Sequence, residues 1–230
     1  MKTLAIDTSN FALGIALAEE ENVVGEYITN INKNHSLRVM PAIETLLNDC
    51  DTKPSDLEKI VVARGPGSYT GVRIGVTIAK TMAWGLKIPI AGVSSLEVLA
   101  ANGRYFNGLV SPLFDARRGQ IYTGLYEYQD HILQPIIADT NILASDWAEK
   151  LKENNRPVIF IGSDVKQHKE TLQGILGDLA FFGSLALDNP RPGELALLGM
   201  HKEEEEVHHF VPNYVRLAEA EAKWLEQQGR

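Results

Sequence analysis

The chain contains the same local pattern twice, and this internal repeat limits the folds it can adopt more than any other feature. The stretch "LAIDTSNFALGIALAEE" has an apolar run, Asp7, a polar turn and a second apolar run. About a hundred residues later, "SPLFDARRGQIYTGLYEY" repeats that order around Asp115. Two such runs joined by a polar turn predict a hairpin, and recurrence at a long interval indicates a duplicated unit. We therefore expect two related α/β halves.

The segments after the first hairpin alternate between the periods of strands and helices. We predict a third strand, helices near residues 36–49 and 70–84, and strands at "IVVARG" and "IPIAGV". A further helix is expected to begin at Ser94, because Ser94 and Glu97 have the spacing of a capping box. This order predicts a mixed sheet with helices on it.

A boundary near residues 104–108 separates an N-terminal half, 1–105, from a C-terminal half, 106–230. In the second half we expect helices near residues 193–206 and 215–228. We expect the last of these to pack back on the N-terminal half.

Charge and cysteine content exclude several classes of protein. The net charge is −8 and the Lys and Arg residues are not clustered, which argues against binding nucleic acid through this chain's own surface. The single cysteine, Cys50, excludes an intrachain disulfide and fits a reducing compartment. Asp7 interrupts any leader-like apolar region, and no apolar run is long enough to span a bilayer. We expect a cytoplasmic protein without membrane contact.

The stretch "GPGSYTG", residues 65–71, lies between a predicted strand and a predicted helix, where phosphate-binding loops are found. A Walker loop needs Lys and then Ser or Thr after its last glycine, but Val72 and Arg73 follow here. The dinucleotide fingerprint needs G-x-G-x-x-G, and this loop has one residue more. The loop therefore fits neither nucleotide motif. Gly71 and Gly75, one helical turn apart, would let another backbone come close.

The helix near residues 70–84 is apolar over most of its circumference, which predicts burial on two sides. Two readings stay open: a central helix buried within its own domain, or a helix that also packs against a partner chain. The two apolar lines and the thin polar stripe between them are Val72, Val76, Ala79 and Ala83; Ile74, Ile78 and Met82; and Arg73, Thr77, Lys80 and Trp84.

An ordered set of motifs over nearly the whole chain resembles the TsaB (YeaZ) family of bacteria. The motifs are "LAIDTS", "GPGSYTGVRIG", "IPIAGVSSLEVLA", "DARRGQIY" and "PNYVR". The resemblance implies two halves of the actin and sugar-kinase (ASKHA) type. It also implies a role in making N6-threonylcarbamoyladenosine in tRNA, from a threonylcarbamoyl-adenylate donor that a separate enzyme makes.

The partners that the resemblance implies are the catalytic paralog TsaD, which transfers the carbamoyl group, and the ATPase TsaE, which joins the complex. This chain would be a non-catalytic scaffold that meets tRNA mainly through its partner and forms a homodimer when alone. In the complex, the helices near residues 36–49 and 70–84 would pack on the same helices of the paralog in a pseudo-symmetric four-helix contact. The predicted contact residues are Val39, Met40, Ile43, Leu47, Val72, Arg73, Val76, Lys80 and Trp84.

The paralog's metal motif is His-x-x-x-His at the start of the helix after its "IP-x-x-G-V" strand. The matching positions here are Ser95 and Leu99, and neither side chain replaces an imidazole. His35 is no substitute, because Val39 stands four residues later. We therefore expect no catalytic residue, no metal and no cofactor. A metallopeptidase, historically attached to this superfamily, is disfavoured for the same reason.

In the actin and sugar-kinase fold, the two hairpin turns hold phosphates. The first turn here has no glycine, so its backbone N–H groups reach phosphate less readily. We expect a vestigial nucleotide cleft, with weak nucleotide binding left open. The rival is an ATP-dependent small-molecule kinase with Asp7 or Asp115 as its general base. The residues of the cleft are Asp7, Thr8 and Ser9 in the first turn and Asp115, Arg117 and Gly119 in the second.

Overall fold

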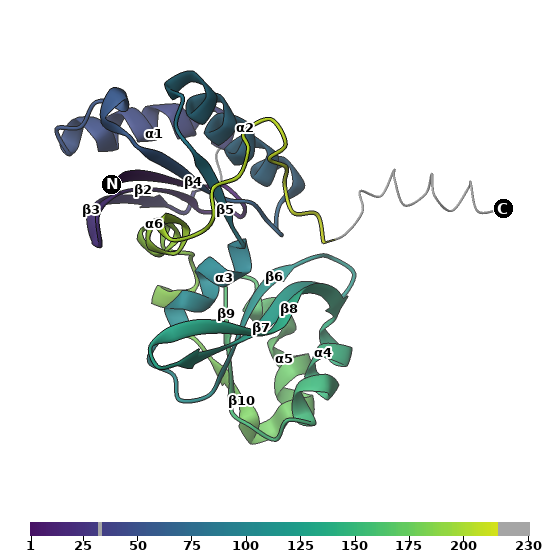
Figure 1. The fold of residues 1–230 in the computed structure, drawn as a ribbon. Helices are drawn as coiled ribbons and strands as arrows, with labels where there is room; N and C mark the ends of the chain where they lie inside the picture. The colour runs from purple at the N-terminus through teal and green to yellow at the C-terminus, as the bar shows by residue number, and fades with distance from the viewer. Residues whose placement is uncertain (32–33, 216–230) are drawn as a thin grey trace.

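The computed structural model describes residues 1–31 and 34–215, which form two five-stranded sheets (Figure 1). The first sheet has the strand order β3-β2-β1-β4-β5. Its central strand, β1, pairs antiparallel with β2, where Leu4 lies opposite Leu17, and parallel with β4, where Leu4 lies beside Ile60. The strands are β1 (Lys2–Asp7), β2 (Leu13–Glu19), β3 (Asn22–Thr29), β4 (Lys59–Ala63) and β5 (Ile90–Val93).

The second sheet repeats this arrangement. Its order is β10-β9-β6-β7-β8, which is the order of the first sheet when each strand is matched to the one five earlier. β6 pairs antiparallel with β7 and parallel with β9, as β1 does with β2 and β4. The predicted duplication into two related halves, each a mixed sheet with helices, is confirmed. The strands are β6 (Leu109–Asp115), β7 (Gln120–Gln129), β8 (Ile132–Leu143), β9 (Val158–Ile161) and β10 (Ala180–Phe182).

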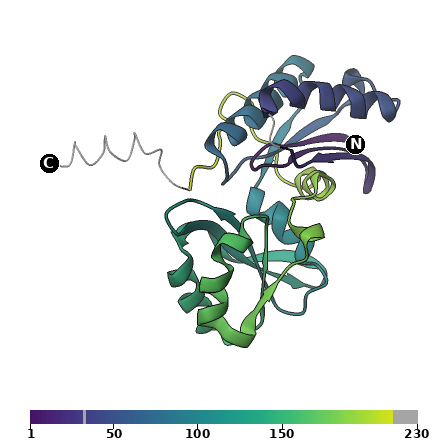
Figure 2. The ribbon, with the colours of Figure 1, turned by 180° about the vertical axis from the view of Figure 1, so that it is seen from behind.

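Helices cover both faces of the first sheet (Figures 1 and 2). α1 (His35–Asp49) and α2 (Tyr69–Leu86) lie on one face, and α6 (Pro192–Met200) lies on the other. Successive side chains of a strand point to opposite faces. Leu4 and Ile6 therefore join the core under α1 and α2, while Ala5 belongs to the cluster under α6. The small residues on the α6 side let that helix lie close to the strands.

The remaining helices belong to the second sheet and to the junction between the halves. α4 (Ala144–Lys152) and α5 (Val165–Leu176) share the core of the second sheet. α3 (Ser95–Ala100) follows β5 but packs on the second sheet. α6 comes after the second sheet in the chain and returns to the first, so the chain crosses between the halves twice within the described residues. Short 3₁₀ turns lie at Pro54–Asp56, Ala101–Gly103, Gly177–Leu179 and Leu185–Leu187.

Residues 201–215, which we call the strap, follow α6. The sequence predicts a helix to about residue 206, but α6 ends at Met200 and the strap runs along the first half. The Glu205 N–H donates to the Ile90 carbonyl at 2.9 Å, and the Asn213 N–H donates to the Arg64 carbonyl at 2.7 Å. The open edge of β5 and the end of β4 offer backbone carbonyls that a continued helix would not reach.

Two sequence expectations concern the end of the chain and the membrane. The helix expected at residues 215–228 falls on residues 216–230, which lie outside those described. Within the described residues, no helix is both long enough and apolar enough to cross a membrane.

The start of α2 packs directly on the turn after β1. The Ser68 N–H donates to the Ser9 carbonyl at 2.7 Å, and the Ser68 hydroxyl caps α2 by accepting from the Gly71 N–H. A Cβ on Gly71 would lie 2.1 Å from the Thr8 carbonyl oxygen, and one on Gly75 would lie 2.5 Å from Thr8 Oγ1. The predicted close backbone approach is confirmed, and the approaching backbone is this chain's own β1 turn.

The close contact predicts opposite effects for two glycines of α2. Gly71→Ala should lower the free energy of unfolding by at least about 2 kcal/mol, because its methyl group must displace the Thr8 backbone. Gly85→Ala should raise it by about 0.5–1 kcal/mol, because nothing lies within 4 Å and alanine favours the helix. Urea denaturation of the two variants measures both effects. Equal shifts in the two variants would contradict the contact.

The burial of α2 predicts a further contrast between neighbouring positions. Val76 is buried in the core under α1 and α2, while Thr77 is exposed. Val76→Glu should lower the free energy of unfolding by about 3 kcal/mol or more, because the core offers no partner for the carboxylate. Thr77→Glu should change it by less than about 0.5 kcal/mol. The measurement is again urea denaturation, and a destabilised Thr77→Glu beside an unaffected Val76→Glu would mean that α2 is rotated about its axis.

Candidate functional site

A cleft of ≈ 680 Å³ lies between the two halves and is bordered by both hairpin turns. Three of the residues predicted for it, Ser9, Asp115 and Arg117, line the cleft. The side chains of Asp7 and Thr8 are instead buried and do not line the cleft. Gly119 is exposed and lies outside the cleft lining. The fold therefore brings the two turns to one cleft but not all six side chains.

The Asp7 carboxylate holds the first turn together. Asp7 Oδ1 accepts hydrogen bonds from the Ser9 backbone N–H at 2.8 Å and from the Ser9 hydroxyl at 2.7 Å. Burial raises the pKa of Asp7, and the two bonds from Ser9 and the nearby His35 oppose that rise. A carboxylate engaged in this way and absent from the cleft lining is poorly placed to act as a general base.

The second turn is held from α5. Asp115 Oδ1 pairs with His168 Nε2 at 3.0 Å, and the Asp115 backbone N–H donates to Asp164 Oδ2 at 3.0 Å. Arg117 has φ = 66° and Gly119 has φ = 75°, so the backbone turns through the left-handed region between β6 and β7. This conformation presents the Arg117 side chain to the cleft.

Asn10 and His35 are cleft residues that the sequence analysis did not predict. His35 Nε2 donates to the Asn10 carbonyl at 2.8 Å, and both residues line the cleft. Asn10 Nδ2 and His35 Nδ1 are buried and have no hydrogen-bond partner among the described residues. Asn10 directly follows the Asp7–Ser9 turn, so its position in the hairpin was a signal. For His35 no local sequence pattern indicates a place beside Asn10.

The two positions matched to the paralog's His pair are packed rather than open. Ser95 is fully buried, and its hydroxyl accepts from the Gly65 N–H at 3.1 Å. Leu99 is fully buried in the cluster that joins α3 to the second sheet. Among the residues that the structure describes, no three His, Cys, Asp or Glu side chains are grouped so as to hold a metal ion.

A second candidate site is a groove of ≈ 920 Å³ between α1 and α2, on the outer face of the first half. Its wall on α2 includes Ile78 and Met82 of the second apolar line predicted from the sequence, while Ile74 of that line lies outside the groove. Met40, half exposed at 48%, contributes from α1. An open groove lined mainly by apolar side chains is a candidate docking site for another protein. Its lining is Met40, Pro41, Ile43, Glu44, Leu47, Asn48, Thr52, Lys53, Pro54, Thr77, Ile78, Thr81, Met82, Gly85 and Leu86.

Most of the predicted contact residues do not face this groove as exposed side chains. The first apolar line of α2 faces the sheet, so Val72 and Val76 are covered by the protein's own core. A helix packed on a sheet presents one face to it, and periodicity alone does not say which. Ile78 and Met82 of the second line therefore face the groove. The predicted contact residues that are buried in the core are Val39, Ile43, Leu47, Val72 and Val76.

The polar stripe of α2 faces the strap. Lys80 Nζ donates to the carbonyls of His208, at 3.2 Å, and Phe210, at 2.7 Å. The Arg73 guanidinium donates to the Tyr69 hydroxyl at 3.0 Å and lies over its ring. Trp84 is 65% exposed beside a hollow that strap residues line. Lys80 and Arg73 thus serve contacts within this chain, and Trp84 is the exposed member of the three.

Comparisons with known proteins agree with this architecture. The family model of TsaD, tRNA N6-adenosine threonylcarbamoyltransferase, matches residues 22–224. The tRNA threonylcarbamoyladenosine biosynthesis protein TsaB of Bacillus subtilis is 62% identical over 228 residues, which cover 99% of this chain and 100% of that protein. TsaB of Escherichia coli is 35% identical over 133 residues, 57% of each chain.

A solved structure is similar over nearly the whole of this chain. It is an uncharacterized protein from Pseudomonas aeruginosa with similarity to the peptidase YEAZ, with a TM-score of 0.81 and 25% identity over 94% of this chain and 99% of that one. The family model, the similar solved structure and the 62% identity over the full length of the Bacillus protein agree with one another. The chain therefore belongs to the TsaB (YeaZ) family of tRNA threonylcarbamoyladenosine biosynthesis proteins.

Proposed function

We propose that this chain is a non-catalytic subunit in the biosynthesis of N6-threonylcarbamoyladenosine in tRNA, and that it acts by binding the catalytic paralog TsaD through the groove between α1 and α2. The single observation that carries the docking proposal is that groove, an apolar surface on the outer side of the first half. The ATPase TsaE joins the resulting complex.

The geometry of the interhalf cleft supports the non-catalytic part of the proposal. Asp7 is buried and bonded to Ser9, and Asp115 is paired with His168. Ser95 and Leu99 occupy the two positions of the paralog's His pair and are packed in the interior. The cleft in this proposal is a remnant of a nucleotide site, and the transfer chemistry belongs to TsaD.

The occupant of the groove is the matching helix pair of TsaD, or of a second copy when this chain is alone. Two related folds that meet through the same helices form a pseudo-symmetric contact in which each apolar line packs against its counterpart. The contact set revised from the structure has an exposed apolar anchor in Met40 and partly buried ones in Ile78 and Met82. Because the net charge is −8, tRNA is held mainly by the partner.

A reconstituted reaction tests the function. TsaD, TsaE, the threonylcarbamoyl-adenylate donor and an ANN-decoding tRNA are incubated with and without this chain, and the modified adenosine is quantified after nuclease digestion. We expect modification to depend on this chain. Equally fast modification without it would contradict the scaffold role.

A substitution in the groove tests the docking face. Thr81 is exposed and lines the groove. Thr81→Arg should raise the Kd for TsaD at least about tenfold, or about 1.4 kcal/mol, because a charged side chain would have to be buried in the contact. Thr171→Arg on α5, an exposed threonine of the other half, is the matched control and should leave the Kd unchanged. Calorimetry with purified TsaD measures both, and equal affinities would place the contact elsewhere.

A further inference from the structure

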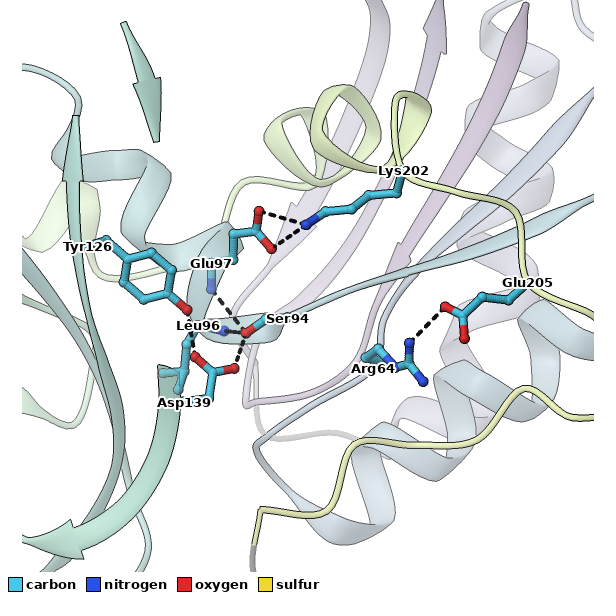
Figure 3. Close-up of polar contacts among 8 residues, drawn as sticks. All are labelled: Arg64, Ser94, Leu96, Glu97, Tyr126, Asp139, Lys202 and Glu205. Carbon is cyan, nitrogen blue, oxygen red and sulfur yellow. Dashed lines mark hydrogen bonds and ion pairs between the residues drawn. The ribbon is translucent and has the colours of Figure 1, made fainter. Parts of the chain in front are cut away.

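Two consecutive serines at the start of α3 reach opposite halves of the molecule. The Ser94 hydroxyl donates to Asp139 Oδ2 on β8, in the second sheet (Figure 3). Ser95 turns to the first half: its N–H donates to the Gly65 carbonyl at 3.0 Å and its hydroxyl accepts from the Gly65 N–H at 3.1 Å. The connection between the two sheets is therefore held from both sides at adjacent residues.

Every hydrogen-bonding position of the Ser94 hydroxyl is used. Its oxygen accepts from the backbone N–H groups of Leu96, at 3.1 Å, and Glu97, at 3.2 Å, which caps α3. A hydroxyl has one donor and two acceptor positions, so the remaining proton goes to Asp139. The orientation needed to cap α3 thus also aims the proton at the second half.

Asp139 is held in place within its own half. Its Oδ1 accepts from the Tyr126 hydroxyl of β7 at 2.6 Å (Figure 3). Burial raises the pKa of Asp139, while the bonds from Ser94 and Tyr126 and the charge of Lys202 oppose that rise. Burial and Asp139 together raise the pKa of Tyr126, which keeps that hydroxyl protonated as a donor. The acceptor for Ser94 is therefore a partly buried carboxylate fixed by a second bond.

The first turn of α3 is also tied to the segment that leaves α6. Glu97 has the capping-box position, but its carboxylate pairs with Lys202 Nζ at 3.0 Å (Figure 3). Further along the strap, Glu205 pairs with Arg64 at 2.7 Å. The strap thereby links the first turn of α3 to Arg64 at the end of β4.

We propose that the Ser94–Asp139 hydrogen bond is a latch that sets the angle between the two halves. Two-domain folds change shape through hinges at the segments that connect their domains. Here that segment is short, capped, buried against the second sheet and bonded to each half. The latch keeps the width of the cleft between the halves constant. The half that carries the α1–α2 groove therefore does not move relative to the other half. This inference concerns the isolated chain and does not depend on the identity of its partner.

Three variants separate the latch from the helix cap. Ser94→Asp keeps an oxygen that caps α3 but faces Asp139 with a second carboxylate. Asp139→Asn is nearly isosteric and turns one acceptor into a donor, while the hydroxyl of Ser94 has no acceptor position left. In the double variant, the amide introduced on β8 donates to the carboxylate introduced at the α3 cap and still accepts from Tyr126. The link thus re-forms with donor and acceptor exchanged, and the net charge of the parent is kept.

The measurement is a distance between the halves. Spin labels are placed in the full chain at Leu37→Cys on α1, where the side chain is 75% exposed, and at the exposed position Glu153→Cys after α4, with Cys50→Ala as background. Pulsed electron double resonance on labelled chain diluted into an excess of unlabelled chain then gives the distance distribution within one copy. We expect a narrow distribution in the parent, a broadened and shifted one in each single variant, and a narrow one again in the double variant.

Tyr126→Phe is the matched control. It removes the other bond to Asp139 within the second half and leaves the link to Ser94, so its distribution should stay close to that of the parent. Asp139→Asn alone keeps an amide oxygen that can accept from Ser94. Parent-like distributions in both Ser94→Asp and Asp139→Asn would therefore overturn the latch. So would a double variant that is as broad as the single ones, because the bond would then not be what sets the angle. The reconstituted modification reaction is measured separately, so failure of the latch leaves the proposed function standing.

Discussion

The backbone contact between the start of α2 and the turn after β1 positions most of the first half. Gly71 allows the Thr8 backbone, and Gly75 the Thr8 hydroxyl, to approach to distances that a Cβ would not permit. The Thr8 hydroxyl adds a bond to the Gly71 carbonyl at 2.7 Å, and Ser68 bonds to Ser9. The N-terminus of α2 is fixed in this way, and one line of its side chains packs against the sheet. Its other faces line the groove and contact the strap.

This contact explains why a loop that looks like a phosphate loop is used differently here. A glycine-rich turn before a helix can approach either an anion or another backbone, since both need space where a Cβ would be. In this chain the β1 turn occupies that space. The Asp7 carboxylate, the candidate for chemistry in such a turn, is bonded to Ser9 and closes the turn instead.

At the start of α3, positions that bind a metal in the paralog make structural contacts in this chain. The family resemblance implies metal-binding histidines in the paralog at the positions matched to Ser95 and Leu99. Here Ser95 bonds the glycine loop and Leu99 packs between the halves. A buried hydroxyl needs partners, and the Gly65 backbone supplies them. Residues at these positions can thus hold the two halves together, which suits a subunit that we propose to act through its outer surface.

The sequence alone determined the duplicated topology, the two apolar lines of α2 and the lack of a His pair at residues 95 and 99. These follow from local order, periodicity and residue type, which do not depend on how the elements are placed. Only the tertiary structure decided that Val72 and Val76 face the core and Ile78 and Met82 the groove, because periodicity relates side chains to one another but not to the sheet. It also decided that Lys80 holds the strap, that Asn10 meets His35 and that Ser94 meets Asp139. Each of these pairs joins residues far apart in the chain, and no local pattern encodes which distant backbone or carboxylate a side chain will meet.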